Sequence, residues 1–436
     1  MRLKFPLGVT GVFVCAAVFS AEPEARPKQD ANGNSIRYAA TGHASNYDEA
    51  KVGAYTLPDL LVLRSGERVR EAAAWTQRRR PELIALYQSE IYGRVPATAP
   101  AVTWETVSTT PGEFNGLAVR KHLVGRFGPD ANGPKVNVVL HVPAQAKGPV
   151  PLLVHLLFSQ PPGLKPPAEA APGKGGKAPA VGPLAEVGPI ADMLARGYAY
   201  ATFRYTEIEG DRADTNLGGV RGLALAKGQE KPAAGEWGTI GAWAWGTSRV
   251  LDQLVKDPAL DAQRIGLIGH SRLGKTVLWA GACDERFGVI FSSCSGEMGA
   301  ALARRDFGET VDDMAANFPW QFTGAFQKYA GHWNDLPVDA HTLIALAAPR
   351  AVFVTGGTKD LWADPKGEFL AQVAAGPVYR LLGRKDLGTT EGPPLDRPLT
   401  DGSLGFHYHT GGHTITPEDW TAFFDFAGKT LRPVRP

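Results

Sequence analysis

The stretch RIGLIGHSRLGKT, from Arg264 to Thr276, joins two different sequence patterns. An apolar run typical of a buried strand ends at Gly269, and helical spacing of apolar residues starts two residues after Ser271. A Gly-x-Ser at a strand-to-helix corner is the nucleophile elbow, which lifts a serine hydroxyl out of the sheet. The amides at the start of the helix then point toward any oxyanion that forms there. The second glycine is Gly274, one residue later than in the usual G-x-S-x-G motif.

The composition is that of a soluble globular protein. The chain has 436 residues, of which 44% are hydrophobic and 21% are charged. Its 46 basic and 44 acidic residues leave a net charge of +2. A balance this even argues against a nucleic-acid partner or an anionic membrane surface, because both require an excess of positive charge.

The first residues have the pattern of an export signal. A short basic segment, Met1–Lys4, precedes the mostly apolar stretch from Phe5 to Phe19, and the small residues Ser20 and Ala21 follow. We expect residues 1–21 to be a signal peptide, with an uncleaved anchor as the alternative. The mature protein is then periplasmic or secreted, with no membrane attachment after cleavage.

Two further regions follow the expected signal. Residues 22–100 read as an N-terminal arm and a helical segment that packs on the main domain. Residues 101–436 alternate strands and helices, with a Pro/Gly-rich surface insertion at 159–183. Strands are expected at 103–109, 117–127, 135–143, 151–158, 198–205, 264–269, 288–294 and 350–357. This alternation predicts an α/β-hydrolase: a doubly wound, mostly parallel sheet covered by helices on both faces.

A serine nucleophile needs a base, and in this fold the base is a histidine near the end of the chain. His413 stands in a glycine-rich loop just before a helix expected to begin near Pro417. His407 and His409 alternate with aromatic residues and have the pattern of strand residues. We therefore expect His413 to be the base, with His407 and His409 as alternatives.

The base in turn needs a carboxylate to orient it. Asp360 follows the strand expected at 350–357, where this fold commonly places its acid, and is our first choice. Asp364 precedes Pro365 and equally suits the N-cap of the next helix. Glu297, after the preceding strand, is a second candidate, with a solvated or ion-paired glutamate as the alternative reading.

The ordered motifs GHSRLGKT, SGEMGAALARRDFGET, TKDLWADPKGEF and HTGGHTITPEDW resemble those of glucuronoyl esterases, family fifteen of the carbohydrate esterases. That family cleaves the ester between 4-O-methyl-glucuronic acid groups of xylan and alcohols of lignin. The resemblance implies that Ser271 is the nucleophile and His413 the base, and that Arg272 helps to hold the oxyanion. The substrate would accordingly be a glucuronoxylan or lignin–carbohydrate ester.

The same resemblance implies a sugar-binding role for Lys275, and for Glu309 and Trp362 a role in holding the uronate ring. Each has an ordinary alternative. Arg272 and Lys275 could be solvated helix positions, Trp362 a packing residue, and Glu309 the partner of one of two arginines, Arg304 or Arg305, in the same stretch.

One position departs from the family pattern. Many members place the catalytic glutamate just before the Ser-Gly that matches Ser295-Gly296, and here that residue is Cys294. Bacterial members that resemble this chain put the acid after the later strand, which again selects Asp360. Cys283 and Cys294 are the cysteines left after signal cleavage, either bonded to each other or free and buried.

The leading interpretation is a secreted serine esterase that acts on glucuronoyl esters, needs no metal or organic cofactor, and is a monomer. An acetylxylan esterase or other carbohydrate esterase would share Ser271 and His413 but would not use Lys275, Glu309 and Trp362 to hold a uronate. A peptidase of the same fold is a weaker alternative. From another class, a catalytically inactive carbohydrate-binding protein would keep the fold without turnover.

Overall fold

The computed structural model describes residues 27–164, 186–213 and 217–433. The expected signal peptide and most of the expected Pro/Gly-rich insertion lie outside the described residues. The chain divides into a short unit that ends at Arg37 and a second unit, Tyr38–Pro436. The sheet and its helices belong to the second unit.

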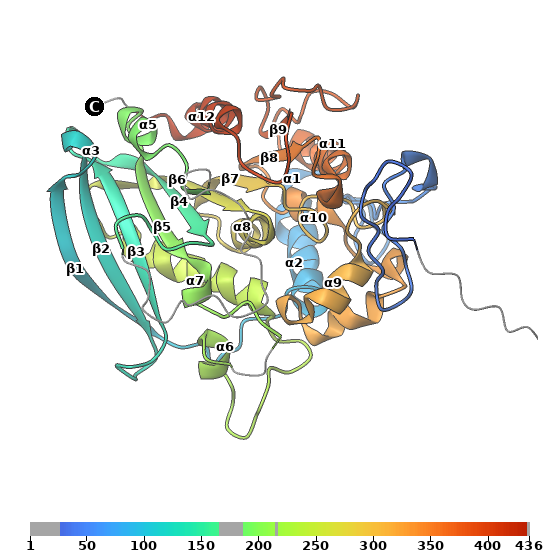
Figure 1. Cartoon of the computed structure of the whole chain (residues 1–436), viewed down its shortest axis with the longest axis horizontal. Coiled ribbons are helices and arrows are strands. Elements are labelled where there is room, and N and C mark those ends of the chain that lie inside the picture. Colours follow the sequence, from blue (N-terminus) through green and yellow to red (C-terminus); the bar gives the residue numbers. More distant parts are fainter. Residues whose placement is uncertain (1–26, 165–185, 214–216, 434–436) are drawn as a thin grey trace, which may run out of the picture. The chain divides into compact units, whose positions relative to one another are not determined.

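A nine-stranded sheet forms in the described part of the chain, in the order β1-β2-β3-β5-β4-β6-β7-β8-β9 (Figure 1). Its strands are β1 Val102–Gly112, β2 Ala118–Phe127, β3 Lys135–Pro143, β4 Val150–Leu157, β5 Ala199–Arg204, β6 Leu260–His270, β7 Phe287–Ser293, β8 Ala351–Gly357 and β9 Leu404–His409. The pairs β1–β2, β2–β3 and β3–β5 are antiparallel, and every pair from β5 to β9 is parallel. The fold is the expected α/β-hydrolase, with its antiparallel strands gathered at one edge.

The parallel strands are mostly apolar in their central stretches because both of their faces are covered. In β8, Val352 and Val354 pack into one hydrophobic core, whereas Ala351 and Phe353 pack into a second core on the opposite face. Successive side chains of a strand point to opposite faces, so a continuous apolar run supplies both cores.

The helices that cover the sheet occupy both faces (Figure 1). Helices α5 and α12 contact the strands from one face, and α8 and α11 pack on the core of the other, with α7 packed against α8 and α10 against α11. The α-helices are α1 Ala72–Ala74, α2 Arg80–Glu90, α3 Glu113–Gly116, α5 Ile190–Ala195, α6 Val220–Leu223, α7 Thr239–Leu254, α8 Arg272–Cys283, α9 Val311–Asn317, α10 Ala340–Ala345, α11 Pro365–Leu381 and α12 Pro417–Leu431. Shorter helical turns are η1 Glu49–Lys51, η2 Trp75–Arg79, η3 Tyr205–Glu207, η4 Pro319–Gln321, η5 Gly324–Tyr329, η6 Trp333–Asp335 and η7 Leu361–Ala363.

The helical segment that precedes the sheet is tied to the helices beside it. The Arg80 guanidinium donates from Nη2 to the carbonyl of Ala282 at 2.7 Å, and the Tyr87 hydroxyl donates to the carbonyl of Asp339 at 3.0 Å. Tyr87 is 1% exposed. These contacts hold α2 against the ends of α8 and α10.

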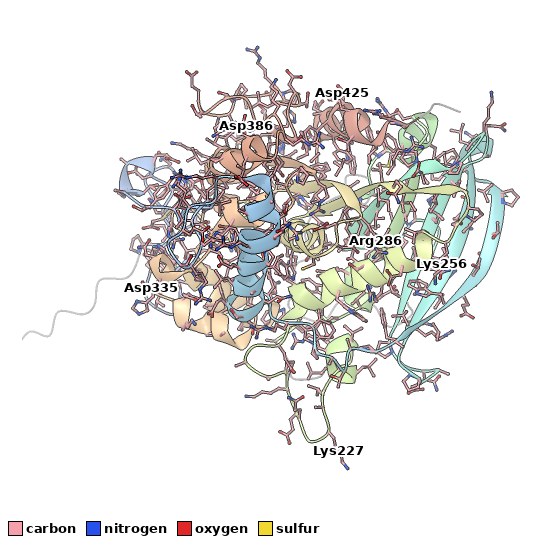
Figure 2. All side chains as sticks on the ribbon, turned by 180° about the vertical axis from the view of Figure 1, so that it is seen from behind. Lys227, Lys256, Arg286, Asp335, Asp386 and Asp425 are labelled. Atoms are coloured by element: carbon pink, nitrogen blue, oxygen red, sulfur yellow. The ribbon has the colours of Figure 1, made fainter. Side chains whose placement is uncertain are left out.

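The surface carries charges of both signs. Figure 2 shows Lys227 and Asp425 at the periphery of the ribbon, and both are exposed. Within the described residues, no helix is both long and apolar enough to cross a bilayer.

Candidate active site

The corner between β6 and α8 has the backbone geometry of an elbow. Ser271 lies between the last residue of β6 and the first residue of α8, with φ 57° and ψ −128°. A non-glycine residue in this region is strained by about 1–3 kcal/mol. Its amide donates to the carbonyl of Ser293 at 2.8 Å, which ties the corner to the neighbouring strand β7. A Cβ at Gly269 would lie 2.3 Å from the carbonyl oxygen of Leu273, so only glycine allows the helix to turn back over the strand.

The displaced second glycine also has a packing role. A Cβ at Gly274 would lie 2.8 Å from the Cβ of Ser295 and 2.9 Å from the hydroxyl of Ser292. Gly274 therefore lets the first turn of α8 pack directly against the end of β7 and the loop after it. This close approach explains why a glycine stands at position 274, one residue later than in G-x-S-x-G.

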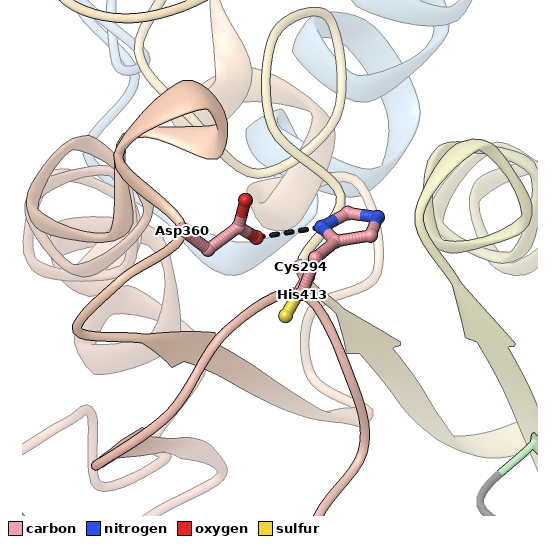
Figure 3. Close-up of side chains that lie close together, drawn as sticks. All are labelled: Cys294, Asp360 and His413. Atoms are coloured by element: carbon pink, nitrogen blue, oxygen red, sulfur yellow. Dashed lines mark hydrogen bonds and ion pairs between the residues drawn. The ribbon is translucent and has the colours of Figure 1, made fainter. Parts of the chain in front are cut away.

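His413 and Asp360 lie together although 53 residues separate them in the chain. The Nδ1 of His413 is 2.6 Å from Oδ2 of Asp360 (Figure 3). Asp360 is 6% exposed, whereas the His413 side chain is 42% exposed. The ring of His413 also lies 4.5 Å from the ring of His270, the residue before Ser271, between centroids. The structure thus brings a buried carboxylate, an accessible imidazole and the strained serine into one region.

The two alternative histidines lie on β9 and face another carboxylate. The Nδ1 of His407 is 2.7 Å from Asp419, and the Nδ1 of His409 is 3.0 Å from it. Burial by itself lowers the pKa of His409, but the hydrogen bond and charge of Asp419 outweigh it and raise that pKa. Both histidines are 2% exposed, so they join β9 to helix α12 rather than to the elbow.

The two alternative acids have other surroundings. Asp364 accepts from the amide of Gly367 at 2.9 Å and from Nε of Arg305 at 2.8 Å, so it is the N-cap of α11. Glu297 is 2% exposed, so the alternative of a solvated glutamate is wrong. Burial raises its pKa well above the ordinary value, and the nearby charges of Asp339 and Glu309 add to the effect.

Arg272 is held by an acid that the sequence analysis missed. Its guanidinium forms an ion pair with Asp211, and its charge lies 5.2 Å from the centre of the Phe318 ring. Asp211 also accepts from Nε1 of Trp320 at 2.7 Å and from Nε2 of Gln321 at 3.1 Å. Burial alone raises the pKa of Asp211, but Arg272 and these donors outweigh it, so the pKa lies below its usual value. The available signal was position, because Asp211 lies in the glycine-containing loop beyond the carboxyl end of β5.

Lys275, Glu309 and Trp362 form one connected group. The Nζ of Lys275 is 3.5 Å from Oε2 of Glu309, and Nε1 of Trp362 donates to Oε1 of Glu309 at 2.9 Å. Lys275 is 5% exposed and Glu309 is 9% exposed. Lys275 is therefore not a solvated helix position, and Arg272, whose side chain is 31% exposed, is held by its ion pair with Asp211.

The expected alternative partners of Glu309 are engaged elsewhere. Arg304 pairs with Asp339 at 3.1 Å, and Arg305 pairs with Asp364 at 2.8 Å. The reading of Glu309 as a partner of either arginine is therefore wrong, and its carboxylate pairs with Lys275 instead.

Both cysteines of the described chain are free thiols. Cys283, at the end of α8, is exposed rather than buried as expected for a free thiol, and Cys294 is 1% exposed. Cys294 follows β7 directly and lies beside the His413–Asp360 pair (Figure 3). Its Sγ, an Asp360 carboxylate oxygen and a His413 ring nitrogen lie within 4.8 Å of one another, a set that could hold a metal ion.

The fold and the elbow define a protein of the α/β-hydrolase class. Residues 170–383 match a family model described as glucuronyl esterase of fungi. The chain is 37% identical to the carbohydrate esterase MZ0003 from an unknown prokaryotic organism, over 88% of this chain and 91% of that protein. The chain therefore belongs to the glucuronoyl esterases, and it is a carboxylic ester hydrolase.

Two further proteins are similar over much of the chain. The structure of a glucuronoyl esterase from Solibacter usitatus is 41% identical, with a TM-score of 0.82, and the match covers 88% of this chain and 100% of that one. A 4-O-methyl-glucuronoyl methylesterase from Cerrena unicolor is 29% identical over 78% of this chain and 64% of that protein. The family resemblance of the motifs is thereby confirmed.

Proposed function

We propose that the chain is a secreted serine esterase that hydrolyses esters of glucuronic acid or its 4-O-methyl form, as in lignin–xylan linkages of plant cell wall. The observation that carries this proposal is the His413–Asp360 pair at 2.6 Å beside the strained Ser271 corner. The name of the Cerrena unicolor relative, a 4-O-methyl-glucuronoyl methylesterase, supports the substrate class.

In the proposed reaction, the hydroxyl oxygen of Ser271 attacks the ester carbonyl while Nε2 of His413 takes its proton. The proton then passes to the departing alcohol oxygen as the carbon–oxygen bond breaks, which leaves a glucuronoyl-serine ester. Water attacks that ester with His413 again as the base, and release of glucuronate restores the serine. Asp360 holds the proton of His413 on Nδ1, so Nε2 keeps the lone pair that the reaction requires.

Arg272 is the proposed stabiliser of the oxyanion, together with its own backbone amide at the start of α8. The ester substrate carries no charge at its reacting carboxyl, so a cation there gains most as negative charge develops in the transition state. Asp211 holds the guanidinium in a fixed position, with its own orientation set by Trp320. A fixed cation needs little reorganisation when the charge appears.

Lys275, Glu309 and Trp362 are proposed to hold the uronate ring. Their connection through Glu309 fixes three polar groups before the sugar arrives. Trp362→Phe keeps an aromatic side chain but removes the indole N–H that donates to Glu309. It should raise KM for a glucuronate ester by about tenfold, about the net worth of one charge-assisted hydrogen bond. Turnover of a nitrophenyl acetate, which has no sugar, should stay near the native value.

The decisive experiment compares benzyl glucuronate with acetylated xylan and nitrophenyl acetate, using native protein and Ser271→Ala. Preference for the glucuronate, lost in the variant, supports both the serine mechanism and the uronate site. Activity on acetates alone would keep Ser271 and discard the sugar roles. Inactivity on all three substrates would favour a carbohydrate-binding protein.

Periplasmic or extracellular location and a monomeric state belong to the same proposal. The absence of a membrane-spanning helix from the described residues is compatible with it. N-terminal sequencing of the mature protein tests cleavage near Ser20 or Ala21, and light scattering tests the monomer.

A further inference from the structure

Three side chains that can each supply a metal ligand lie close together: those of Cys294, Asp360 and His413. A ligand atom of each of Cys294, Asp360 and His413 lies within 4.8 Å of the others (Figure 3). The three residues come from separate places in the fold: directly after β7, after β8, and from the loop between β9 and α12. Cys294 and Asp360 are 1% and 6% exposed, whereas the His413 side chain is 42% exposed and open to solvent.

This ligand set suits a soft or borderline divalent cation. Thiolate sulfur, imidazole nitrogen and carboxylate oxygen are the donors that bind Zn²⁺ in proteins, usually in tetrahedral geometry. Bond lengths of about 2.0–2.3 Å place two ligands of one tetrahedral ion about 3.5 Å apart. The widest separation in the cluster therefore has to shrink by up to about 1.3 Å, whereas Nδ1 of His413 and Oδ2 of Asp360, which are 2.6 Å apart, have to separate by a little under about 1 Å. His413 stands on a loop with Gly411 and Gly412 just before it.

We propose that Cys294, Asp360 and His413 bind a thiophilic divalent cation such as Zn²⁺ or Cd²⁺, and that the bound cation switches the esterase off. The inhibitory part rests on the proposed function, in which His413 is the base. The binding part rests on the cluster alone.

Inhibition follows from which nitrogen the cation occupies. Nδ1 is the ring nitrogen on the Asp360 side, so it is the one that faces the cluster. When a cation takes the Nδ1 lone pair, the proton that Nδ1 carried moves to Nε2, and the ring stays neutral. Nε2 then bears a hydrogen and cannot accept the proton of Ser271.

The thiol also exchanges its proton. The sulfur–hydrogen bond of Cys294 breaks, a sulfur–metal bond forms, and the proton leaves to solvent.

The test uses Co²⁺ as a spectroscopic probe and Zn²⁺ as the inhibitor, on chelator-treated full-length mature protein. Native protein and Cys283→Ser should develop a thiolate-to-cobalt charge-transfer band that saturates at one ion per chain. Cys294→Ser should lack the band. Each variant's esterase activity is then titrated with Zn²⁺, and Cys294→Ser should need at least about tenfold more Zn²⁺ for half-inhibition, because it has lost a ligand.

The outcomes separate the two parts of the proposal. Absence of the charge-transfer band from the native protein, or its survival in Cys294→Ser, overturns the site. Equal Zn²⁺ sensitivity of native protein and Cys294→Ser overturns the inhibitory role. A chain that binds Co²⁺ through Cys294 but hydrolyses no ester would refute the proposed function and leave the site standing. Cys294→Ala replaces the serine variant should that variant fail to fold.

Discussion

Asp360→Asn changes one atom of a buried side chain and should remove most of the catalysis. The carboxylate of Asp360 accepts the Nδ1 proton of His413 at 2.6 Å and is 6% exposed. An asparagine amide in the same place can donate its N–H to Nδ1. That arrangement favours the tautomer with hydrogen on Nε2, which cannot take a proton from Ser271.

The size of the loss combines two effects. Losing a hydrogen bond to a charged group costs about 1.5–3 kcal/mol. The wrong tautomer and the lost stabilisation of the imidazolium add to this cost. Together they predict a decrease in kcat of about 10³- to 10⁴-fold, or about 4 to 5.5 kcal/mol of transition-state stabilisation. KM should change little, because Asp360 lies behind the histidine and away from the serine corner.

The assay is steady-state hydrolysis of benzyl glucuronate by native protein, Asp360→Asn and Glu297→Gln. The glutamate is the matched control, because it is a second buried carboxyl group after a neighbouring strand, and burial and the charges of Asp339 and Glu309 raise its pKa well above the ordinary value. An amide has almost the same shape as a carboxyl group, and the hydrogen bond of His413 goes to Asp360 rather than to Glu297, so Glu297→Gln should keep kcat within about threefold of native.

Two results would refute this reasoning. A loss smaller than about tenfold in Asp360→Asn would mean that another group orients His413. A larger loss in Glu297→Gln than in Asp360→Asn would transfer the role of the acid to the buried glutamate. Circular dichroism and thermal unfolding of each variant check that the fold is intact.

Gly274→Ala should lower the free energy of unfolding by about 1–3 kcal/mol, because the added Cβ would lie 2.8 Å from the Cβ of Ser295. The control is Gly428→Ala on α12, where the nearest atom would lie 3.9 Å away, so this change should be neutral or stabilising. Urea unfolding measures both variants. Because pairing with Asp419 raises the pKa of His409, the pair stabilises the fold fully at pH values below the ordinary 6.5 of histidine. This contribution is lost as the pH rises through the raised pKa. Because the pKa of Asp419 is lowered, its contribution to stability is fully present above the ordinary value of 3.8 and is lost as the pH falls through the lowered value. The stability difference between native protein and His409→Gln should therefore be larger at about pH 6 than at about pH 8, and an equal difference would contradict the assignment. Activity should survive dialysis against a chelator, and a loss reversed by added metal would instead indicate a required ion.

Local patterns in the sequence were enough for the class of fold. An apolar run such as the one in β8 supplies both buried faces of a strand. The glycine at position 269 is required because the helix turns back over the strand there. Strand, corner and helix could therefore be predicted from residues that are close in sequence. The N-cap role of Asp364 is likewise local, because the accepting carboxylate of Asp364 and the donating amide of Gly367 are three residues apart. Such features depend on contacts within a few residues.

Only the tertiary structure decided which candidates meet. Three histidines lie within seven positions of one another: His407, His409 and His413. The first two lie on β9 and pair with Asp419 of α12, whereas the third lies in the following loop and pairs with Asp360. The Arg272–Asp211 pair spans 61 positions and joins the first residue of α8 to the loop after β5, which come together only because the carboxyl ends of parallel strands share one edge of the sheet. The burial of Glu297 and the place of Cys294 behind the histidine have the same origin. Side-chain partners across such distances are chosen by packing, because burial and partner identity arise only once the strands are in order.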